Sequence, residues 1–319
     1  MKEKIMVSIC CVTYNQEKYI SKAIDSFLNQ ETNFSYEIII HDDASTDGTV
    51  EIINDYKKKY PNKIVTIFEK ENQYSKRPNS ILDIVFSKAK GKYIALCDGD
   101  DGFCSKNKLQ LQFDKLESDS SISLVSHNTV VVDNDGILLE ENSPYPDGIV
   151  TEIDFLNNYN SSMHTSSLMF RKKDVKRLPD YFNDSLVGDL PLKLYLLSIG
   201  NCYHIDKVMS FYRKNSSGSW TLNQKKNKKI LNNNFLNEIK VYNSFNKESK
   251  YQYDGEIKGR ILNRKFNFYK DNGNLKEIKK IEYHDLYNDL SFSEKVKLYL
   301  KNNKTIYDIY YRVKYGKKR

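Results

Sequence analysis

The chain contains 319 residues, of which 39% are hydrophobic and 29% are charged. This length exceeds one typical domain, so we expect a main domain with an appendage. No apolar stretch approaches the roughly 18 residues that a membrane-spanning helix needs. The net charge of +8 is uneven: residues 1–220 hold 31 acidic against 26 basic side chains, and residues 221–319 hold 11 against 24. The acidic first part, without any recognition motif, argues against a protein that binds nucleic acid.

The first hundred residues alternate short apolar runs with segments of helical spacing. The apolar runs predict strands over residues 7–13, 36–40, 64–68 and 93–97. Helical spacing follows each of the first three runs, beginning at Ile20, near Val50 and near Ile81, and Asp47 or Thr49 can cap the second helix. Strands that alternate with helices in this way indicate βαβ units and a mainly parallel sheet.

The strand predicted over residues 93–97 runs directly into Asp98-Gly99-Asp100-Asp101. Three carboxylates this close repel one another by about 1 kcal/mol per pair at 4 Å in water, and by more inside a protein. A divalent cation that neutralises a diphosphate would relieve this repulsion. The alternative is an acidic turn in which Gly99 and Gly102 supply conformational freedom.

Two further polar segments, residues 13–17 and 42–49, follow the first and second predicted strands. The carboxyl ends of parallel strands meet at one edge of a sheet, where open α/β sheets bind ligands. We therefore expect these segments and residues 98–101 to converge on a nucleotide or phosphate site.

The three segments resemble the motifs of family 2 glycosyltransferases with the GT-A fold. They are Ser8–Asn15 (SICCVTYN), Asp42–Thr49 (DDASTDGT) and Gly91–Asp101 (GKYIALCDGDD). The resemblance covers roughly residues 5–220. It implies a Rossmann-like, mainly parallel sheet flanked by helices, followed by a C-terminal helical extension. It also implies an inverting enzyme that moves a sugar from a nucleotide-sugar, usually a UDP-sugar, with Mn²⁺ or Mg²⁺ as cofactor.

The resemblance also assigns residues of the nucleotide site. Thr13, Asn15 and Glu17 match the family's first nucleotide-contacting loop. Asp43 matches the acid that accepts an N–H from the base edge, which suits a carboxylate. Asn72 lies where a loop after the third strand approaches the nucleotide-sugar.

The metal site falls on the acidic cluster. Asp98 matches the first acid of the family's DxD motif, and Asp100 matches the second, which holds the metal on the diphosphate. Asp101 is the adjacent acid, which is structural or faces the sugar. Relatives continue with an aromatic pair where this chain has Gly102-Phe103-Cys104, and Phe103 is the expected partial substitute.

Asp189 matches the family's catalytic base, which accepts the proton of the attacking acceptor hydroxyl. The alternative is a helix N-cap, because Leu190-Pro191 opens a helical segment. His164 lies near the expected acceptor side. Arg213 and Lys214 could reach the diphosphate leaving group or belong to a solvated loop, and Trp220 could stack on a sugar or anchor its loop.

We expect a catalytic domain over residues 1–220, with nucleotide-sugar binding in about 1–105 and the acceptor side in about 106–220. Residues 221–319 form a basic helical region. Its expected helices are 231–242, 258–269, 275–283, 292–300 and 306–313. Such a region suits peripheral contact with an anionic membrane. A solvated extension and an oligomer contact are alternatives that the sequence leaves open.

The five cysteines are odd in number and lie mostly in predicted strands, which indicates reduced thiols inside the cell. The apolar start, residues 5–12, is a core strand without a cleavage site after it. We expect a cytoplasmic glycosyltransferase, peripheral on the inner face of the cell membrane, that uses a glycan or lipid-linked acceptor for cell-surface polysaccharide or glycolipid synthesis. The alternatives are a haloacid-dehalogenase-like phosphatase, whose Asp-x-Asp loop normally follows the first strand, and a non-catalytic nucleotide-binding protein with the same fold.

Overall fold

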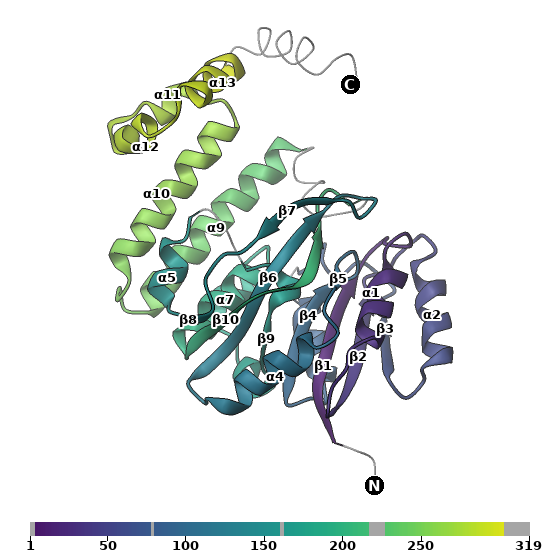
Figure 1. Cartoon of the computed structure of the whole chain (residues 1–319). Helices are drawn as coiled ribbons and strands as arrows, with labels where there is room; N and C mark the ends of the chain where they lie inside the picture. The colour runs from purple at the N-terminus through teal and green to yellow at the C-terminus, as the bar shows by residue number, and fades with distance from the viewer. Residues whose placement is uncertain (1–3, 78–79, 160–162, 217–226, 303–319) are drawn as a thin grey trace. The chain divides into compact units, whose positions relative to one another are not determined.

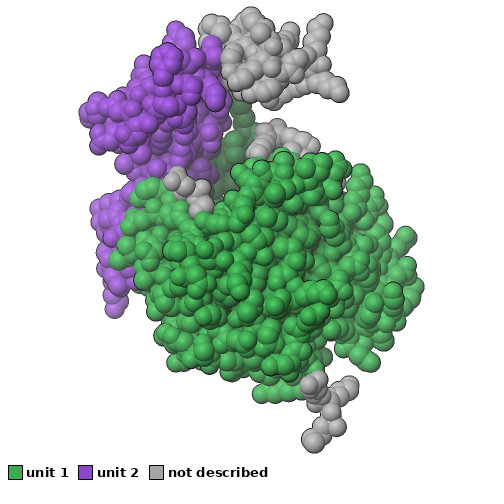
Figure 2. All heavy atoms as spheres, in the orientation of Figure 1, with its two compact units in different colours: residues 1–249 green, residues 250–319 purple. Residues whose placement is uncertain are grey.

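The computed structural model describes residues 4–77, 80–159, 163–216 and 227–302. The chain divides into two compact units, residues 1–249 and residues 250–319 (Figure 2). The first unit contains the whole sheet.

The sheet has the strand order β3-β2-β1-β4-β9-β6-β10-β5, with β7 on β6 and β8 on β10 (Figure 1). The strands are β1 Ile5–Thr13, β2 Ser35–Asp42, β3 Ile64–Phe68, β4 Tyr93–Asp98, β5 Gly102–Phe103, β6 Ile122–Val132, β7 Leu138–Asn142, β8 Gly148–Val150, β9 Met169–Arg171 and β10 Asn201–Arg213. The four strands from β3 to β4 are parallel, as are β6 and β10. The predicted α/β fold with a mainly parallel sheet is confirmed.

The register of the parallel strands brings the predicted polar segments together. Thr13 at the end of β1 pairs with Asp42 at the end of β2, and Val12 pairs with Asp98 at the end of β4. The segments 13–17, 42–49 and 98–101 therefore leave the sheet side by side at one edge.

Within the segment 164–171, only the last three residues form a strand. Thr165–Ser167 forms the short helix η1, and only Met169–Arg171 joins the sheet, as β9. This short strand lies antiparallel between β4 and β6 and joins the two parallel parts of the sheet.

The helices of the first unit pack around this sheet (Figure 1). They are α1 Ile20–Leu28, α2 Thr49–Lys59, α3 Ser80–Lys88, α4 Lys108–Ser118, α5 Glu152–Asn157, η2 Lys172–Val175, α6 Asp180–Asn183, α7 Asp189–Ser198 and α9 Lys228–Glu248. Residues of α1, α2 and α4 share one core cluster with Val7, Ile9 and Cys11, which are alternate residues of β1. The helical spacing that predicted α1 is its buried face: Ile20, Ala23, Ile24 and Phe27.

The C-terminal helices differ in extent from their predicted ranges. The helix predicted over 231–242 is α9, which packs on α6 through Tyr181 and Phe245, with ring centroids 6.2 Å apart. This helix belongs to the first compact unit, which therefore extends past residue 220 to residue 249. The end of the catalytic domain that we expect at residue 220 stays a prediction.

The second unit contains α10 Asp254–Asp271, α11 Leu275–Ile278, η3 Ile281–Tyr283, α12 His284–Asn288 and α13 Phe292–Asn302. The segment 275–283 is therefore two short helices and not one. The helix predicted over 306–313 lies outside the described residues. Within the described part of the chain, no helix combines the length and apolar character that crossing a membrane requires.

Lys108 is a fully buried lysine at the start of α4. Its ammonium group donates to Gln112 Oε1 at 2.7 Å and lies 4.0 Å from the centroid of the Phe103 ring. Burial lowers the pKa of Lys108 from 10.5 to about 7, since a buried ammonium loses its hydration.

This burial predicts a pH dependence of stability. Between pH 7 and 10.5 the unfolded chain binds the proton more tightly than the folded chain, so Lys108 makes stability rise with pH, by at most about 1.4 kcal/mol per unit. Lys108→Met removes this contribution, so urea unfolding at pH 7, 8 and 9 should show a flatter dependence than the wild type. Lys58→Met, at an exposed site on α2, is the control. Parallel curves for wild type and Lys108→Met would contradict the assignment.

Candidate active site

The acidic loop begins at the last residue of β4 and is held against the end of β1. The Gly99 N–H donates to the Val12 carbonyl at 2.9 Å, and the Asp101 N–H donates to the Asp98 carbonyl at 3.1 Å. A Cβ on Gly99 would lie 2.8 Å from Thr13 Cβ and Oγ1 and would also overlap the Gln16 amide. Glycine at position 99 therefore allows the loop to contact the β1 end directly.

Asp98 is partly buried and lies close to two other carboxylates, whose negative charges repel its own. Burial, the charge of Asp100 and the charge of Asp189 together raise the pKa of Asp98 to about 7. The carboxylate accepts no hydrogen bond from the described residues. Asp189 comes from α7, about ninety residues away in sequence, so the fold unites the predicted metal ligand and the predicted base in one site.

Asp100 and Asp101, unlike Asp98, accept hydrogen bonds from neighbouring residues in the described ranges. The Asp100 carboxylate accepts the Ser216 hydroxyl and is also bonded by Gln16. Asp101 Oδ1 accepts the Arg213 backbone N–H at 2.8 Å and is buried. Burial raises the pKa of both carboxyls. These contacts fit the structural role that the sequence left open for Asp101, and the other role, facing the sugar, stays a prediction.

Arg213 lies behind the acidic loop and does not extend into open solvent. Its Nε donates to the Asp100 carbonyl at 3.0 Å, and Nη1 donates to the carbonyls of Asp133 and Asn134 at 2.7 and 2.9 Å. The guanidinium also lies 4.7 Å from the centroid of the Tyr19 ring. It is 3% exposed, so it joins three loops from within the protein.

Two other residues near this loop were singled out from sequence. Lys214 forms an exposed ion pair with Glu140 at 3.1 Å, which fits the solvated alternative. Phe103 lies in the core against Phe27, with centroids 4.9 Å apart, because its segment pairs with β10 as β5. It is buried in the core, so its ring is not open to a bound sugar. Trp220 lies outside the described residues.

The predicted nucleotide loop is tied to the segment that follows β2. Asn15 adopts the left-handed conformation (φ 52°), and its Oδ1 accepts the Thr46 N–H at 2.7 Å. Glu17 Oε2 accepts the Gly48 N–H at 2.8 Å, which occupies a free amide at the start of α2. Thr13 donates to Gln16 Oε1 at 2.7 Å. These contacts shape the loop, and their roles toward a nucleotide stay predictions.

Asp43 organises the loop after β3. Its carboxylate accepts the Gln73 N–H at 2.6 Å and the Tyr74 N–H at 3.0 Å, and the Asn72 amide donates to its carbonyl at 3.3 Å. Asp43 and Asn72 are expected from sequence at one nucleotide site, and the structure brings them into contact. A carboxylate has about four acceptor positions, so two remain for a base edge.

Asp189 is the first residue of α7, and the N-cap is Gly188. Its Oδ2 accepts Lys193 Nζ at 2.8 Å, and Lys193, which is almost fully buried, also donates to the Met163 carbonyl. Burial would raise the pKa of Asp189, but the Lys193 charge and hydrogen bond lower it below its usual value. The carboxylate is therefore ionised at neutral pH and 39% exposed at the site.

His164 lies on the same side of the site. It stacks on Tyr212 with centroids 4.5 Å apart, and its Nδ1 lies 2.6 Å from Thr129 Oγ1. Burial and the charge of Lys193 lower the pKa of His164 to about 4. This imidazole is therefore neutral at physiological pH, and it acts as a hydrogen-bond donor or acceptor and not as a cation.

Three contributing residues, Gln16, Lys193 and Ser216, were missed from sequence. Only Lys193 had a readable signal, since it lies four positions after Asp189 on a helix. Gln16 belongs to the segment 13–17 that was expected to converge with the acidic loop, but its side-chain contact with Asp100 was not predicted. Ser216 reaches Asp100 from a distant segment, which no local pattern could reveal.

The acidic residues supply two carboxylates suitable for a hard divalent cation. No group of three or more His, Cys, Asp or Glu side chains within the described ranges is arranged to hold a metal. The unsatisfied Asp98 carboxylate beside Asp100 fits the kind of site in which one or two carboxylates and substrate phosphates share a cation.

Residues 8–178, more than half of the chain, match the family model of Glycosyl transferase family 2. The chain belongs to this family. An uncharacterized protein of Mycobacterium tuberculosis (strain ATCC 25618 / H37Rv) is 32% identical over 218 residues, which are 67% of this chain and 60% of that protein. The match thus spans about 60% of the length of this relative.

Solved structures share the fold. Residues 1–349 of S. aureus TarS in complex with UDP-GlcNAc align with a TM-score of 0.63 and 18% identity, over 95% of this chain and 89% of that one. The mannosyltransferase PcManGT from Pyrobaculum calidifontis, in complex with GDP-Man and Mn²⁺, gives 0.54 and 12%, over 99% and 89%. At these identities the likeness establishes the GT-A fold alone.

The contact of Gly99 with the β1 end can be tested directly. Gly99→Ala should destabilise the first unit by about 1–3 kcal/mol, because the added methyl group overlaps Thr13 and Gln16. Urea unfolding measures this loss. Gly255→Ala is the control, since its Cβ would meet no atom within 4 Å. A Gly99→Ala variant as stable as the wild type would show that the loop packs less tightly on the β1 end than these distances require.

Proposed function

We propose that this enzyme transfers a sugar from a UDP-sugar to an acceptor hydroxyl with inversion at the anomeric carbon. One observation carries the proposal: the charges of Asp98, Asp100 and Asp189 meet at the carboxyl edge of the parallel strands. A diphosphate site and a proton acceptor are thereby next to each other, which group transfer from a nucleotide-sugar requires. The UDP-GlcNAc in the TarS complex supports the choice of nucleotide.

The nucleotide portion would bind across the ends of β1 and β2. Asp43 accepts the N–H of the base edge through its remaining acceptor positions. Thr13, Asn15 and Glu17 form the adjoining loop, and Asn72 closes it from the segment after β3. The contacts described above hold this loop in shape before the nucleotide arrives, which reduces the entropy cost of binding.

Asp98 and Asp100 would hold Mn²⁺ or Mg²⁺. The cation would supply charge neutralisation for the diphosphate as it leaves. The Mn²⁺ in the PcManGT complex supports this cofactor. Gln16 and Ser216 fix the Asp100 carboxylate and Arg213 fixes the loop backbone, so these residues position the ligands.

Asp189 would take the proton of the acceptor hydroxyl as that oxygen attacks the anomeric carbon. Lys193 holds the carboxylate ionised and oriented at 2.8 Å. The ion pair makes Asp189 a weak base in the ground state, so proton transfer accompanies the attack and does not precede it.

The acceptor would be a glycan or a lipid-linked glycan of a cell-surface polysaccharide or glycolipid. Residues 221–319 would place the enzyme at the anionic inner face of the membrane, through a region with 24 basic and 11 acidic side chains. Thermal-shift screening of nucleotide-sugars with Mn²⁺ tests the substrate class. Stabilisation by UDP-sugars supports the proposal, and its absence across all nucleotide-sugars would refute it. Phosphate release from simple esters without an acceptor would favour the phosphatase alternative.

Asp100→Ala should abolish metal-dependent UDP binding, because it removes a carboxylate from a two-carboxylate site. Calorimetric titration with UDP, with and without Mn²⁺, measures the effect, which we expect to exceed roughly 100-fold, since one of two charged ligands is lost. Asp114→Ala, on the exposed side of α4, is the matched control. Unchanged affinity in Asp100→Ala would remove Asp100 from the metal site.

Asp189→Asn should retain UDP binding and lose transfer by roughly 10²–10⁴-fold, the usual contribution of a general base. The amide keeps the shape and cannot accept the proton. Transfer rates with saturating UDP-sugar and binding by calorimetry separate the two effects. Near-normal transfer would assign the base to another residue.

A further inference from the structure

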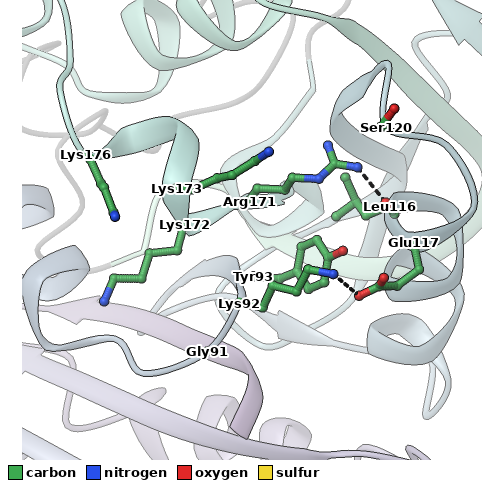
Figure 3. Close-up of a pocket in the computed structure, with 10 residues that line it drawn as sticks. All are labelled: Gly91, Lys92, Tyr93, Leu116, Glu117, Ser120, Arg171, Lys172, Lys173 and Lys176. Carbon is green, nitrogen blue, oxygen red and sulfur yellow. Dashed lines mark hydrogen bonds and ion pairs between the residues drawn. The ribbon is translucent and has the colours of Figure 1, made fainter.

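A cavity of about 560 Å³ lies where β4 begins, at the edge of the sheet opposite the acidic loop (Figure 3). Its charged lining residues are Lys92, Glu117, Arg171, Lys172, Lys173 and Lys176. The six residues of β4 separate this cavity from Asp98 by on the order of 20 Å. A small ligand bound here would not touch the acidic loop.

Lys92 and Lys172 are neighbours along the backbone, and their side chains point away from each other (Figure 3). Tyr93 pairs with Arg171 across β4 and β9, and the Lys172 N–H donates to the Lys92 carbonyl at 2.9 Å. Lys92 precedes β4 and Lys172 follows β9, so two neighbouring backbone segments each contribute a lysine to the lining of the cavity. The scaffold is tight, since a Cβ on Gly91 would lie 2.6 Å from the Ser8 backbone N. The backbone next to Lys92 is therefore held directly against β1.

The cavity carries more positive than negative charge. Lys92 pairs with Glu117 at 2.6 Å, as Figure 3 shows. Arg171 donates to the carbonyls of Leu116 and Asp119, at 2.6 and 3.0 Å, and of Ile122. The Lys172 ammonium donates to the Ala89 carbonyl. Carbonyl groups orient these cations and do not neutralise them.

Lys173 and Lys176 are exposed and make no ion pair with any described residue. Two more carboxylates lie nearby: Asp119 is close to Arg171, and Asp174 is close to both Lys173 and Arg171. With Glu117 they make three carboxylates against five cations. The cavity therefore favours an anion.

We propose that this cavity binds the phosphate group of a phosphate ester. Its volume suits a phosphate with a small organic group, and clustered ammonium groups beside a guanidinium are the side chains that bind phosphate. The phosphate could come from a soluble ester or from a lipid headgroup, which present the same group. This site is separate from the proposed UDP-sugar site and does not rest on it.

The test uses the full chain and sn-glycerol 3-phosphate, titrated calorimetrically at low salt. Lys173→Glu/Lys176→Glu should weaken binding by at least about tenfold, since two phosphate-facing charges are reversed, and both positions are exposed, so folding should be unaffected. Lys58→Glu/Lys59→Glu on α2 makes the same change of net charge outside the cavity and should leave the affinity unchanged. Sedimentation with phosphatidylglycerol vesicles, against phosphatidylcholine vesicles, tests the lipid source with the same variants.

Binding of either probe that is lost only in Lys173→Glu/Lys176→Glu supports the proposal, and the probe that binds identifies the source. Equal loss in both double variants would mean a general charge effect and would overturn it. Failure of both probes to bind the wild type would also overturn it. Displacement of glycerol phosphate by saturating UDP with Mn²⁺ would place the ester at the acidic edge and overturn the separate site.

Discussion

The main constraint on this structure is the repulsion among carboxylates that lie together at one edge of the sheet. β4 ends in Asp98, Asp100 and Asp101 follow it, and α7 brings Asp189 to the same place. Burial raises the pKa of the carboxyls at positions 98, 100 and 101. A fold can keep such a cluster only by supplying hydrogen bonds and positive charge. It supplies them unequally: Asp100 and Asp101 accept hydrogen bonds, whereas Asp98 accepts none from the described residues.

Arg213 serves the structural part of the cluster. Its backbone N–H bonds Asp101, and its guanidinium bonds the carbonyl of Asp100 and those of a hairpin that begins at Asp133. Losing this residue would remove a cation whose charge favours ionisation of the buried Asp100 and Asp101 carboxyls, which is far more costly than losing an exposed ion pair. Asp98, by contrast, receives no hydrogen bond from the part of the chain that the structure describes. Asp98 and Asp101 thus have the same carboxyl group in different surroundings, because Asp101 accepts a hydrogen bond from Arg213 and Asp98 does not.

The sequence predicted the parallel part of the fold because its signals are local. Apolar runs and helical spacing located β1 to β4, and three polar segments at strand ends located the candidate site. The bounds and antiparallel pairing of β9 were not predicted, because a strand of three residues is too short to show an alternating hydrophobic pattern. The orientation of Arg213 was also beyond reach, since a sequence pattern does not show which way a side chain points. Lys193 was accessible through its helical spacing from Asp189.

The Asp189–Lys193 pair explains how two acids can lie near each other and differ in protonation. Each carboxylate disfavours ionisation of the other through repulsion. Lys193 contacts only Asp189 of the two, so Asp189 remains ionised while the pKa of Asp98 rises to about 7. In the proposed reaction a proton on Asp189 would weaken the bond to Lys193 and relieve the repulsion with Asp98. These two effects oppose each other, so the neighbours of Asp189 moderate the free-energy cost of the proton it accepts.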